Sequence, residues 1–161
     1  MTWKPGQPVR LETERFLLRT LNRLQIVRYT YEWSFDPEVM NPFGLEAGIW
    51  SRRKWYRRFK KADNRRRFYF GIWPKVSDKP IGMEVVDVDS RRVATLSIVI
   101  GDRRWWGKGV VQETRRAVIA FIFEQLQCPE CGACRPPAIS RRFSIIRSWD
   151  LPARAFCAST G

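Results

Sequence analysis

The sequence predicts a single α/β (α+β) domain, and three observations support this fold class. The length of 161 residues suits one domain with one hydrophobic core. Strand-like runs at residues 81–88 and 93–100 are separated by a short polar segment, which favours a hairpin. The chain then continues into residues 110–126, where apolar side chains recur at helical spacing.

The other expected elements come from the same patterns of periodicity and turn residues. In order, they are a first strand at residues 11–21, a helix at 24–40 interrupted near Pro37, a loop at 41–48, an amphipathic helix at 49–61, a strand at 67–73 and a glycine-containing loop at 101–109. No internal repeat or linker divides the chain, so we expect one domain over residues 1–161.

The composition is strongly basic, with 30 Lys and Arg against 16 Asp and Glu and a net charge of +14. Such a balance favours anionic partners, such as nucleic acid or phosphorylated cofactors. The chain has no His, which excludes Ser-His-Asp and Cys-His catalysis. An apolar leader and a stretch of about 18–20 apolar residues are both missing, so we expect a cytoplasmic protein without membrane contact.

Residues 96–113, LSIVIGDRRWWGKGVVQE, are the most informative segment. An expected strand runs into a loop that contains Gly107 and Gly109, and the loop runs into a helix. Glycines let the backbone approach a ligand closely, and the first amides of a helix favour an anion. Arg103, Arg104 and Lys108 add positive charge. The pattern predicts a phosphate-binding loop, which is neither a Walker A loop nor a GxGxxG loop.

The same segment resembles motif A of the GNAT superfamily of N-acetyltransferases, in the branch that reads IGD…WGKGxGxEA. Residues 106–111 take the place of the family's Q/R-x-x-G-x-G/A, with Trp106 first and Val111 last, and Glu113 takes the acidic position in the helix. The segments RLETERFLLRTL and KPIGMEVVDVD resemble two strands of that branch, which is similar to ribosomal-protein N-acetyltransferases. The three matches follow the family order and cover most of residues 9–127.

This resemblance implies both a fold and a reaction. The fold is a GNAT-type mixed, largely antiparallel central sheet flanked by helices. In the reaction, a primary amine attacks the thioester of acetyl-CoA directly, without an acyl-enzyme, and the protein supplies proximity and proton removal. The acceptor would be a protein N-terminus or a small amine.

The resemblance also implies site residues. The pantetheine would pair with the strand backbone at Ile98, Val99 and Ile100. The remaining cofactor-binding candidates are Arg103, Trp106, Gly107, Lys108, Gly109, Val110 and Val111. Glu84 is the first candidate for the base and Asp87 is the second, the alternative for both being a solvated strand carboxylate.

Ten Lys or Arg lie between Arg52 and Arg67, interleaved with Trp55, Tyr56 and Phe59. Such a segment can contact RNA or the ribosome, or it can be a solvated face above an aromatic core stripe. We expect the aromatic residues to belong to the core. In the family this region borders the acceptor cleft, so a basic rim would suit an anionic acceptor and repel a polyamine. Formation of a homodimer is left open.

Residues 128–161 do not resemble the family. In the frame one base earlier, the same nucleotides permit NxxSxxxYxKLGFxREGVLR, which has the spacing of the family's C-terminal motifs. We therefore hypothesise that this atypical tail is a frameshift product, that the cluster of Cys128, Cys131 and Cys134 is accidental, and that no metal is bound. An altered C-terminus leaves two alternatives to an active enzyme: an acyl-CoA-binding module without turnover, and a basic RNA-binding protein.

Overall fold

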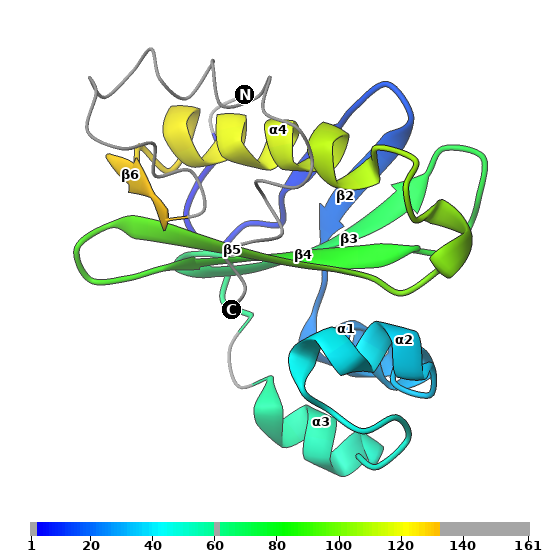
Figure 1. Cartoon of the computed structure of the whole chain (residues 1–161). Coiled ribbons are helices and arrows are strands. Elements are labelled where there is room, and N and C mark those ends of the chain that lie inside the picture. Colours follow the sequence, from blue (N-terminus) through cyan, green and yellow to red (C-terminus); the bar gives the residue numbers. More distant parts are fainter. Residues whose placement is uncertain (1–2, 60–61, 133–161) are drawn as a thin grey trace.

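The computed structural model describes residues 3–59 and 62–132, and its centre is a six-stranded sheet (Figure 1). The strands are β1 (Arg10–Glu12), β2 (Phe16–Thr20), β3 (Arg67–Pro74), β4 (Gly82–Val88), β5 (Val93–Ile100) and β6 (Glu130–Cys131). They lie in chain order, with β1 to β5 antiparallel and β6 parallel to β5. This topology confirms the mixed, largely antiparallel sheet.

Helices cover both faces of the sheet (Figure 1). On one face lie α1 (Arg23–Trp33), α2 (Pro37–Met40) and α3 (Arg52–Arg58). The short 3-10 turn η1 (Asn41–Phe43) directly follows α2. On the other face lies α4 (Val110–Glu124). Within the described part of the chain, no helix combines the length and the apolar character that crossing a bilayer requires.

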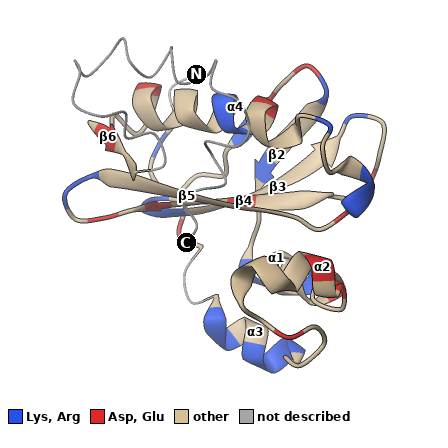
Figure 2. Cartoon of the chain, viewed as in Figure 1, with Lys and Arg blue, Asp and Glu red and all other residues tan. Residues whose placement is uncertain are grey.

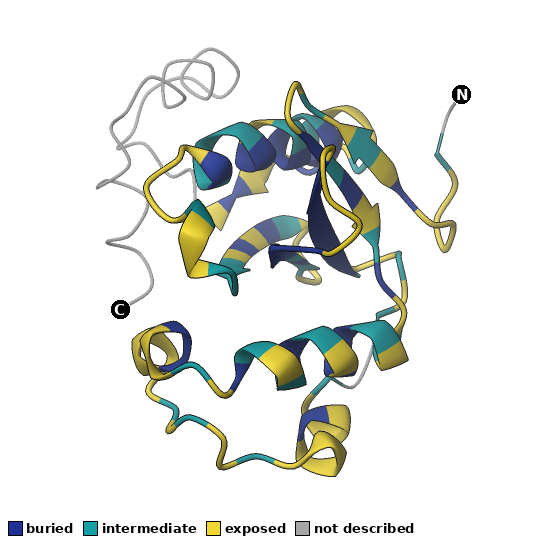
Figure 3. Cartoon of the chain, turned by 90° about the vertical axis from the view of Figure 1, so that its right-hand side faces the viewer, coloured by how far each residue is buried: buried dark blue, intermediate teal, exposed yellow. Residues whose placement is uncertain are grey.

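Strand β3 shows why two layers of helices are needed. Phe68, Phe70 and Ile72 alternate with Tyr69 and Trp73, and all five side chains are buried. Successive strand residues point to opposite faces, so the first three join the core beneath α4 and the other two join the core beneath α1. Figure 3 shows these buried stretches between the two helical layers.

The expected strand at residues 11–21 is two strands, so this prediction was wrong in its continuity. The chain turns after β1, where the N–H of Thr13 donates to the carbonyl of Phe16 at 2.9 Å, and β2 returns alongside β1. Within the turn, the Thr13 hydroxyl accepts from the N–H of Phe16 at 3.0 Å, and Glu113 of α4, about a hundred residues away in the chain, bonds to the side chains of Thr13 and Arg15. A pattern of apolar residues reveals neither kind of contact.

The expected helix at residues 49–61 is shorter in the described residues, where α3 begins after the cap Ser51 and ends at Arg58. The expected interruption near Pro37 is confirmed, because α2 starts at this residue after α1 ends at Trp33. Most of the hypothesised frameshift tail, residues 133–161, lies outside the described residues.

Candidate active site

The connection from β5 to α4 is held by hydrogen bonds at its start. The N–H groups of Gly101 and Asp102 both donate to the carbonyl of Ile81, at 2.8 and 3.0 Å. Asp102 then caps the 3-10 turn η2 (Arg103–Trp105), since its carboxylate accepts from the backbone N–H and from Nε of Arg104 at 3.1 and 3.0 Å. The bond from the Arg104 side chain lowers the pKa of Asp102. These contacts fix the loop ahead of its glycines.

The N-terminus of α4 has no side-chain cap, unlike the other three α-helices in the described ranges. The side chains that cap α1, α2 and α3 are Asn22, Asp36 and Ser51. Helix α4 follows Gly109, whose φ is 73°, and its first backbone bond runs from the N–H of Glu113 to the carbonyl of Gly109 at 3.2 Å. The amides of residues 107–112 therefore find no acceptor within the described residues. Together with the helix dipole, they favour an anion such as a diphosphate.

Glu113 anchors this end of α4 to the turn between β1 and β2. Its Oε1 accepts from the Thr13 hydroxyl at 2.7 Å and from the Arg15 backbone N–H at 2.8 Å, and its Oε2 accepts from Arg15 Nε at 2.7 Å. Arg15 also donates through Nη2 to the carbonyl of Lys108 at 2.9 Å, inside the loop. Burial opposes the ionisation of Glu113, but the bonds from Thr13 and Arg15 outweigh it and lower its pKa.

Replacement of Glu113 by alanine is expected to lower the free energy of unfolding by about 2–3 kcal/mol at pH 7, because charge-assisted hydrogen bonds are lost and Arg15 and Thr13 lose their partner. Since the pKa of Glu113 is lowered, its contribution is present above the ordinary value of 4.5 and is lost as the pH falls through the folded-state pKa. Urea unfolding at pH 7 and in acid measures both effects. Glu124→Ala, at the exposed end of α4, is the control and should cost less than about 0.5 kcal/mol. A Glu113 variant as stable as this control would contradict the assigned anchor.

The other expected loop residues surround the uncapped helix end. Trp106 is 42% exposed, and its indole N–H donates to the carbonyl of Ile100 at 2.9 Å. Lys108 lies over the Trp105 ring, with Nζ 5.6 Å from the centroid. Arg103 forms a long surface ion pair of 3.8 Å with Asp36. The Val110 side chain is buried beneath the helix and Val111 is half-buried, so both would offer backbone amides rather than side chains.

The expected pantetheine strand has an unpaired edge. Strand β5 pairs with β4 from Ala94 to Ile100 but with β6 only at Val93 and Ala94. From Thr95 onward, its other edge therefore has no strand neighbour in the described part of the chain. Ile98, Val99 and Ile100 lie in this half of β5, where backbone groups on the open edge can pair with an extended ligand that carries amides, although the Ile100 carbonyl already accepts from the Trp106 indole.

Glu84 is placed differently from the expectation. Its side chain is fully buried on the α4 side of the sheet, and Oε1 accepts from Nε of Arg115 in α4 at 3.0 Å. Burial raises the pKa of Glu84 to about 7, against the opposing effects of the Arg115 charge and hydrogen bond. This enclosure favours a role in the core, and the assignment of Glu84 as the base stays a prediction.

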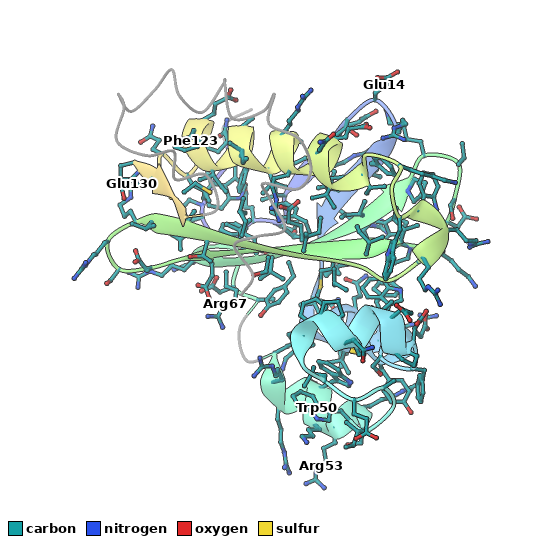
Figure 4. The ribbon with its side chains drawn as sticks, viewed as in Figure 1. Glu14, Trp50, Arg53, Arg67, Phe123 and Glu130 are labelled. Carbon is teal, nitrogen blue, oxygen red and sulfur yellow. The ribbon has the colours of Figure 1, made fainter. Side chains whose placement is uncertain are left out.

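Asp87, the second candidate, lies on the opposite face and lines a cavity of about 490 Å³. The cavity lies between the sheet and the layer of α1 to α3, and Ser97, Ile98 and Val99 of β5 also line it. Asp87 Oδ2 accepts from Nε of Arg67 on β3 at 3.0 Å. Figure 4 shows Arg67 on this same side of the sheet. The cavity therefore brings one candidate base to the strand that is expected to bind pantetheine.

Sequence reasoning missed several cavity residues, among them Arg67 and Tyr69 on β3. Tyr69 is buried, and burial raises its pKa, so its hydroxyl stays protonated at neutral pH. Strand alternation could have predicted that Tyr69 points to the opposite face of the sheet from Phe68 and Phe70. Arg115, the partner of Glu84, gave no such signal.

The basic segment forms an exposed rim below the cavity. Arg52, Arg53, Lys54, Arg57 and Arg58 are exposed on α3, which is the blue helix at the lower edge of Figure 2. Trp55 is buried and packs with its ring parallel to that of Phe59, at a centroid distance of 5.7 Å. Tyr56, in contrast, is exposed beneath the guanidinium of Arg23. Two of the three aromatic residues thus follow the core alternative, and an RNA or ribosome contact stays a prediction.

The cysteines carry no metal site in the ranges that the structure describes. Cys128 and Cys131 are buried free thiols, and Cys134 lies outside the described residues. No group of three or more His, Cys, Asp or Glu side chains comes together in residues 3–59 and 62–132.

The structure is an α+β domain in which a half-unpaired strand of a largely antiparallel sheet leads through a glycine loop into an uncapped helix, an arrangement that favours an anion at the strand–helix junction. Residues 15–151 match the family described as Acetyltransferase (GNAT) domain, and the chain belongs to this family. The match continues beyond Gln127, where the sequence resemblance was expected to end. The frameshift and the ribosomal-protein branch stay predictions.

Solved structures with the same fold include a GNAT-family acetyltransferase from Bacillus anthracis, which is 16% identical, with 76% of this chain and 71% of that chain covered and a TM-score of 0.59. The spermidine N-acetyltransferase from Vibrio cholerae, solved with CoA and spermine, is 18% identical over 73% and 69%, with a TM-score of 0.60. An aminoglycoside acetyltransferase solved with coenzyme A is 13% identical over 72% of each chain, with a TM-score of 0.59. At these identities the likeness shows the fold alone. No curated protein matches the sequence.

Proposed function

We propose that the protein is an acetyl-CoA-dependent N-acetyltransferase that acetylates a primary amine bound in the cavity between the sheet and α1 to α3. The observation that carries this proposal is the position of β5. Its unpaired half borders that cavity at Ser97 to Val99 and leads directly into the uncapped N-terminus of α4. One strand can thus align the thioester with the acceptor while the loop binds the diphosphate.

In this reaction the amine nitrogen forms a bond to the thioester carbonyl carbon, and the carbon–sulfur bond breaks with its electron pair going to sulfur. The proton that the nitrogen loses passes first to a base and finally to the CoA thiolate. The chain's own contribution is to hold the two substrates together and to accept the proton. Asp87 is the carboxylate that the cavity offers for this second task, and Glu84 stabilises the packing beneath α4. The acceptor would be a small amine, in keeping with the spermidine and aminoglycoside enzymes of the same fold.

Acetyl-CoA is expected to raise the melting temperature, because a ligand that binds only the folded state stabilises it. At a hundred times its Kd, the ligand should add about 2.7 kcal/mol, which corresponds to a rise of roughly 5–10 °C for a domain of this size. Thermal unfolding with and without acetyl-CoA measures the shift. Pantetheine, which lacks the diphosphate, is the matched control and should give a much smaller rise at equal concentration.

A second measurement separates turnover from binding. Release of CoA thiol in the presence of a panel of amines indicates an enzyme, whereas a thermal shift without thiol release would leave an acyl-CoA-binding module. The proposal fails if acetyl-CoA produces no shift in well-folded protein.

A further inference from the structure

The acceptor cavity is largely apolar and aromatic. Its lining includes the rings of Trp33, Phe43, Trp55, Phe59 and Tyr69, together with several aliphatic and methionine side chains. Its volume of about 490 Å³ lies within the range of roughly 300–1,000 Å³ that is common for sites of small molecules. The cavity therefore suits a compact ligand with an apolar or aromatic body.

The cavity offers one carboxylate to a cationic group. Asp87 is the sole acidic residue that lines the described cavity, and both hydrogen bonds from Arg67 go to its Oδ2. Within the described residues, Oδ1 consequently has no hydrogen-bond partner and can accept from an N–H donor. One ammonium group can be accepted there, and it would lie beside the expected position of the thioester on β5.

Arg58, at the C-terminal end of α3, supplies a positive charge on the other wall of the cavity. No carboxylate lies within ion-pair distance of its guanidinium in the described residues; the guanidinium lies 5.9 Å from the centroid of the Trp50 ring, and its charge also acts on the Tyr69 hydroxyl. With Arg67 already paired to Asp87, Arg58 is the lining cation that is available for an anion. Further ammonium groups, as in a polyamine, would meet Arg58 and the basic rim of α3.

Two buried polar groups add hydrogen-bonding capacity to the same walls. Thr30 Oγ1 and Trp55 Nε1 are buried without a hydrogen-bond partner in the described structure, although both residues line the cavity. The indole N–H can only donate, and a hydroxyl can donate as well. Buried donors of this kind normally have a hydrogen-bond partner, and a ligand that carries oxygen atoms could accept from both groups.

Resting on the proposed function, we infer that the acceptor is a small zwitterionic amine, of the amino-acid type, with an aromatic or apolar side chain. Its ammonium group lies at Oδ1 of Asp87, its carboxylate is paired with Arg58, and its side chain packs among the aromatic residues. This assignment separates the chain from the spermidine and aminoglycoside acetyltransferases with the same fold, whose named acceptors carry several amines.

Three probe amines test the assignment in the thiol-release assay with acetyl-CoA. Phenylalanine, phenethylamine and spermidine differ in the carboxylate, in the aromatic body and in the number of cations. We expect kcat/KM to fall about tenfold from phenylalanine to phenethylamine, and further to spermidine. Equal or faster turnover of spermidine would overturn the inference while leaving the acetyltransferase intact. Absence of thiol release with every amine, without a thermal shift by acetyl-CoA, would instead overturn the proposed function.

A pair of variants on α3 tests the role of Arg58. Arg58→Gln should remove the preference for phenylalanine over phenethylamine and leave acetyl-CoA binding unchanged. Arg53→Gln removes a charge from the same helix, but Arg53 is exposed and points away from the sheet (Figure 4), so the preference should persist. If Arg58→Gln keeps the preference for phenylalanine, the carboxylate does not pair with Arg58. If both variants lose the preference equally, it arises from the general positive charge of α3 and not from a specific pair with Arg58.

Discussion

Replacement of Arg115 by methionine is expected to lower the free energy of unfolding by about 3–5 kcal/mol at pH 8, because it leaves a buried carboxylate without its counter-charge. Glu84 is fully buried, and Arg115 Nε lies 3.0 Å from its Oε1. At pH 5 the loss should be considerably smaller. Burial already raises the pKa of Glu84 from 4.5 to about 7, and removal of Arg115 raises it further, so the carboxyl is neutral in the folded variant.

The sign of this pH dependence follows from linkage. An acid whose folded-state pKa is raised stabilises the fold most below its unfolded-state pKa, and this contribution is lost as the pH rises through the folded-state value. The variant should therefore lose stability relative to the parent between pH 5 and pH 8. Urea unfolding at the two pH values measures the difference.

The double variant Glu84→Met, Arg115→Met is the matched control for this ion pair. Replacement of both charges by apolar groups of similar length should restore much of the stability and abolish the pH dependence that the single variant gains. A single variant whose loss is the same at pH 5 and pH 8 would contradict a buried, titrating Glu84. Retention of thiol release by the double variant would agree with a packing role and exclude Glu84 as the base.

Gly107→Val is expected to weaken acetyl-CoA binding at least tenfold. Gly107 has a φ of 74°, a conformation that costs an L-residue about 1–2 kcal/mol, and the new side chain would stand among the amides that are proposed to bind the diphosphate. Isothermal titration with acetyl-CoA measures the change in Kd.

Gly44→Val provides an unusually close control for this substitution. Gly44 has a φ of 66°, and an added Cβ would meet nothing within 4 Å at either glycine, so both variants carry similar strain without steric overlap. Both should lose comparable stability, and only the Gly107 variant should lose affinity for acetyl-CoA. Equal affinities in the two variants would remove the glycine loop from the proposed diphosphate site.

The loop and its flanking elements could be predicted from the sequence because their signals are local. Apolar alternation predicted β4 and β5, helical spacing predicted α4, and Gly107 and Gly109 marked the junction between them. The uncapped start of α4 is likewise a property of neighbouring residues, since Gly109 has no side chain to cap it. The turn between β1 and β2 was missed because apolar alternation does not report the polar contacts that hold it, which are the local bond of Thr13 to Phe16 and the distant bond of Thr13 to Glu113.

The two candidate bases illustrate what the sequence left undecided. Glu84 and Asp87 are three residues apart on one strand, so period-two alternation places them on opposite faces of the sheet. Alternation does not reveal which face is closed by α4 and which borders the cavity. The structure decides this through packing, with Glu84 against Arg115 and Asp87 beside Arg67.

By itself, the sequence predicted the family, most of the elements and the glycine loop that is proposed to bind the diphosphate, since each depends on backbone conformation and periodicity within short segments. Only the tertiary structure decided which carboxylate lines the cavity and which lining cation has no ion-pair partner among the described residues. That cavity is assembled by Asp87, Arg67 and Arg58 from three separate elements, and the distances between such residues are fixed by packing of the sheet against its helices rather than by any local pattern.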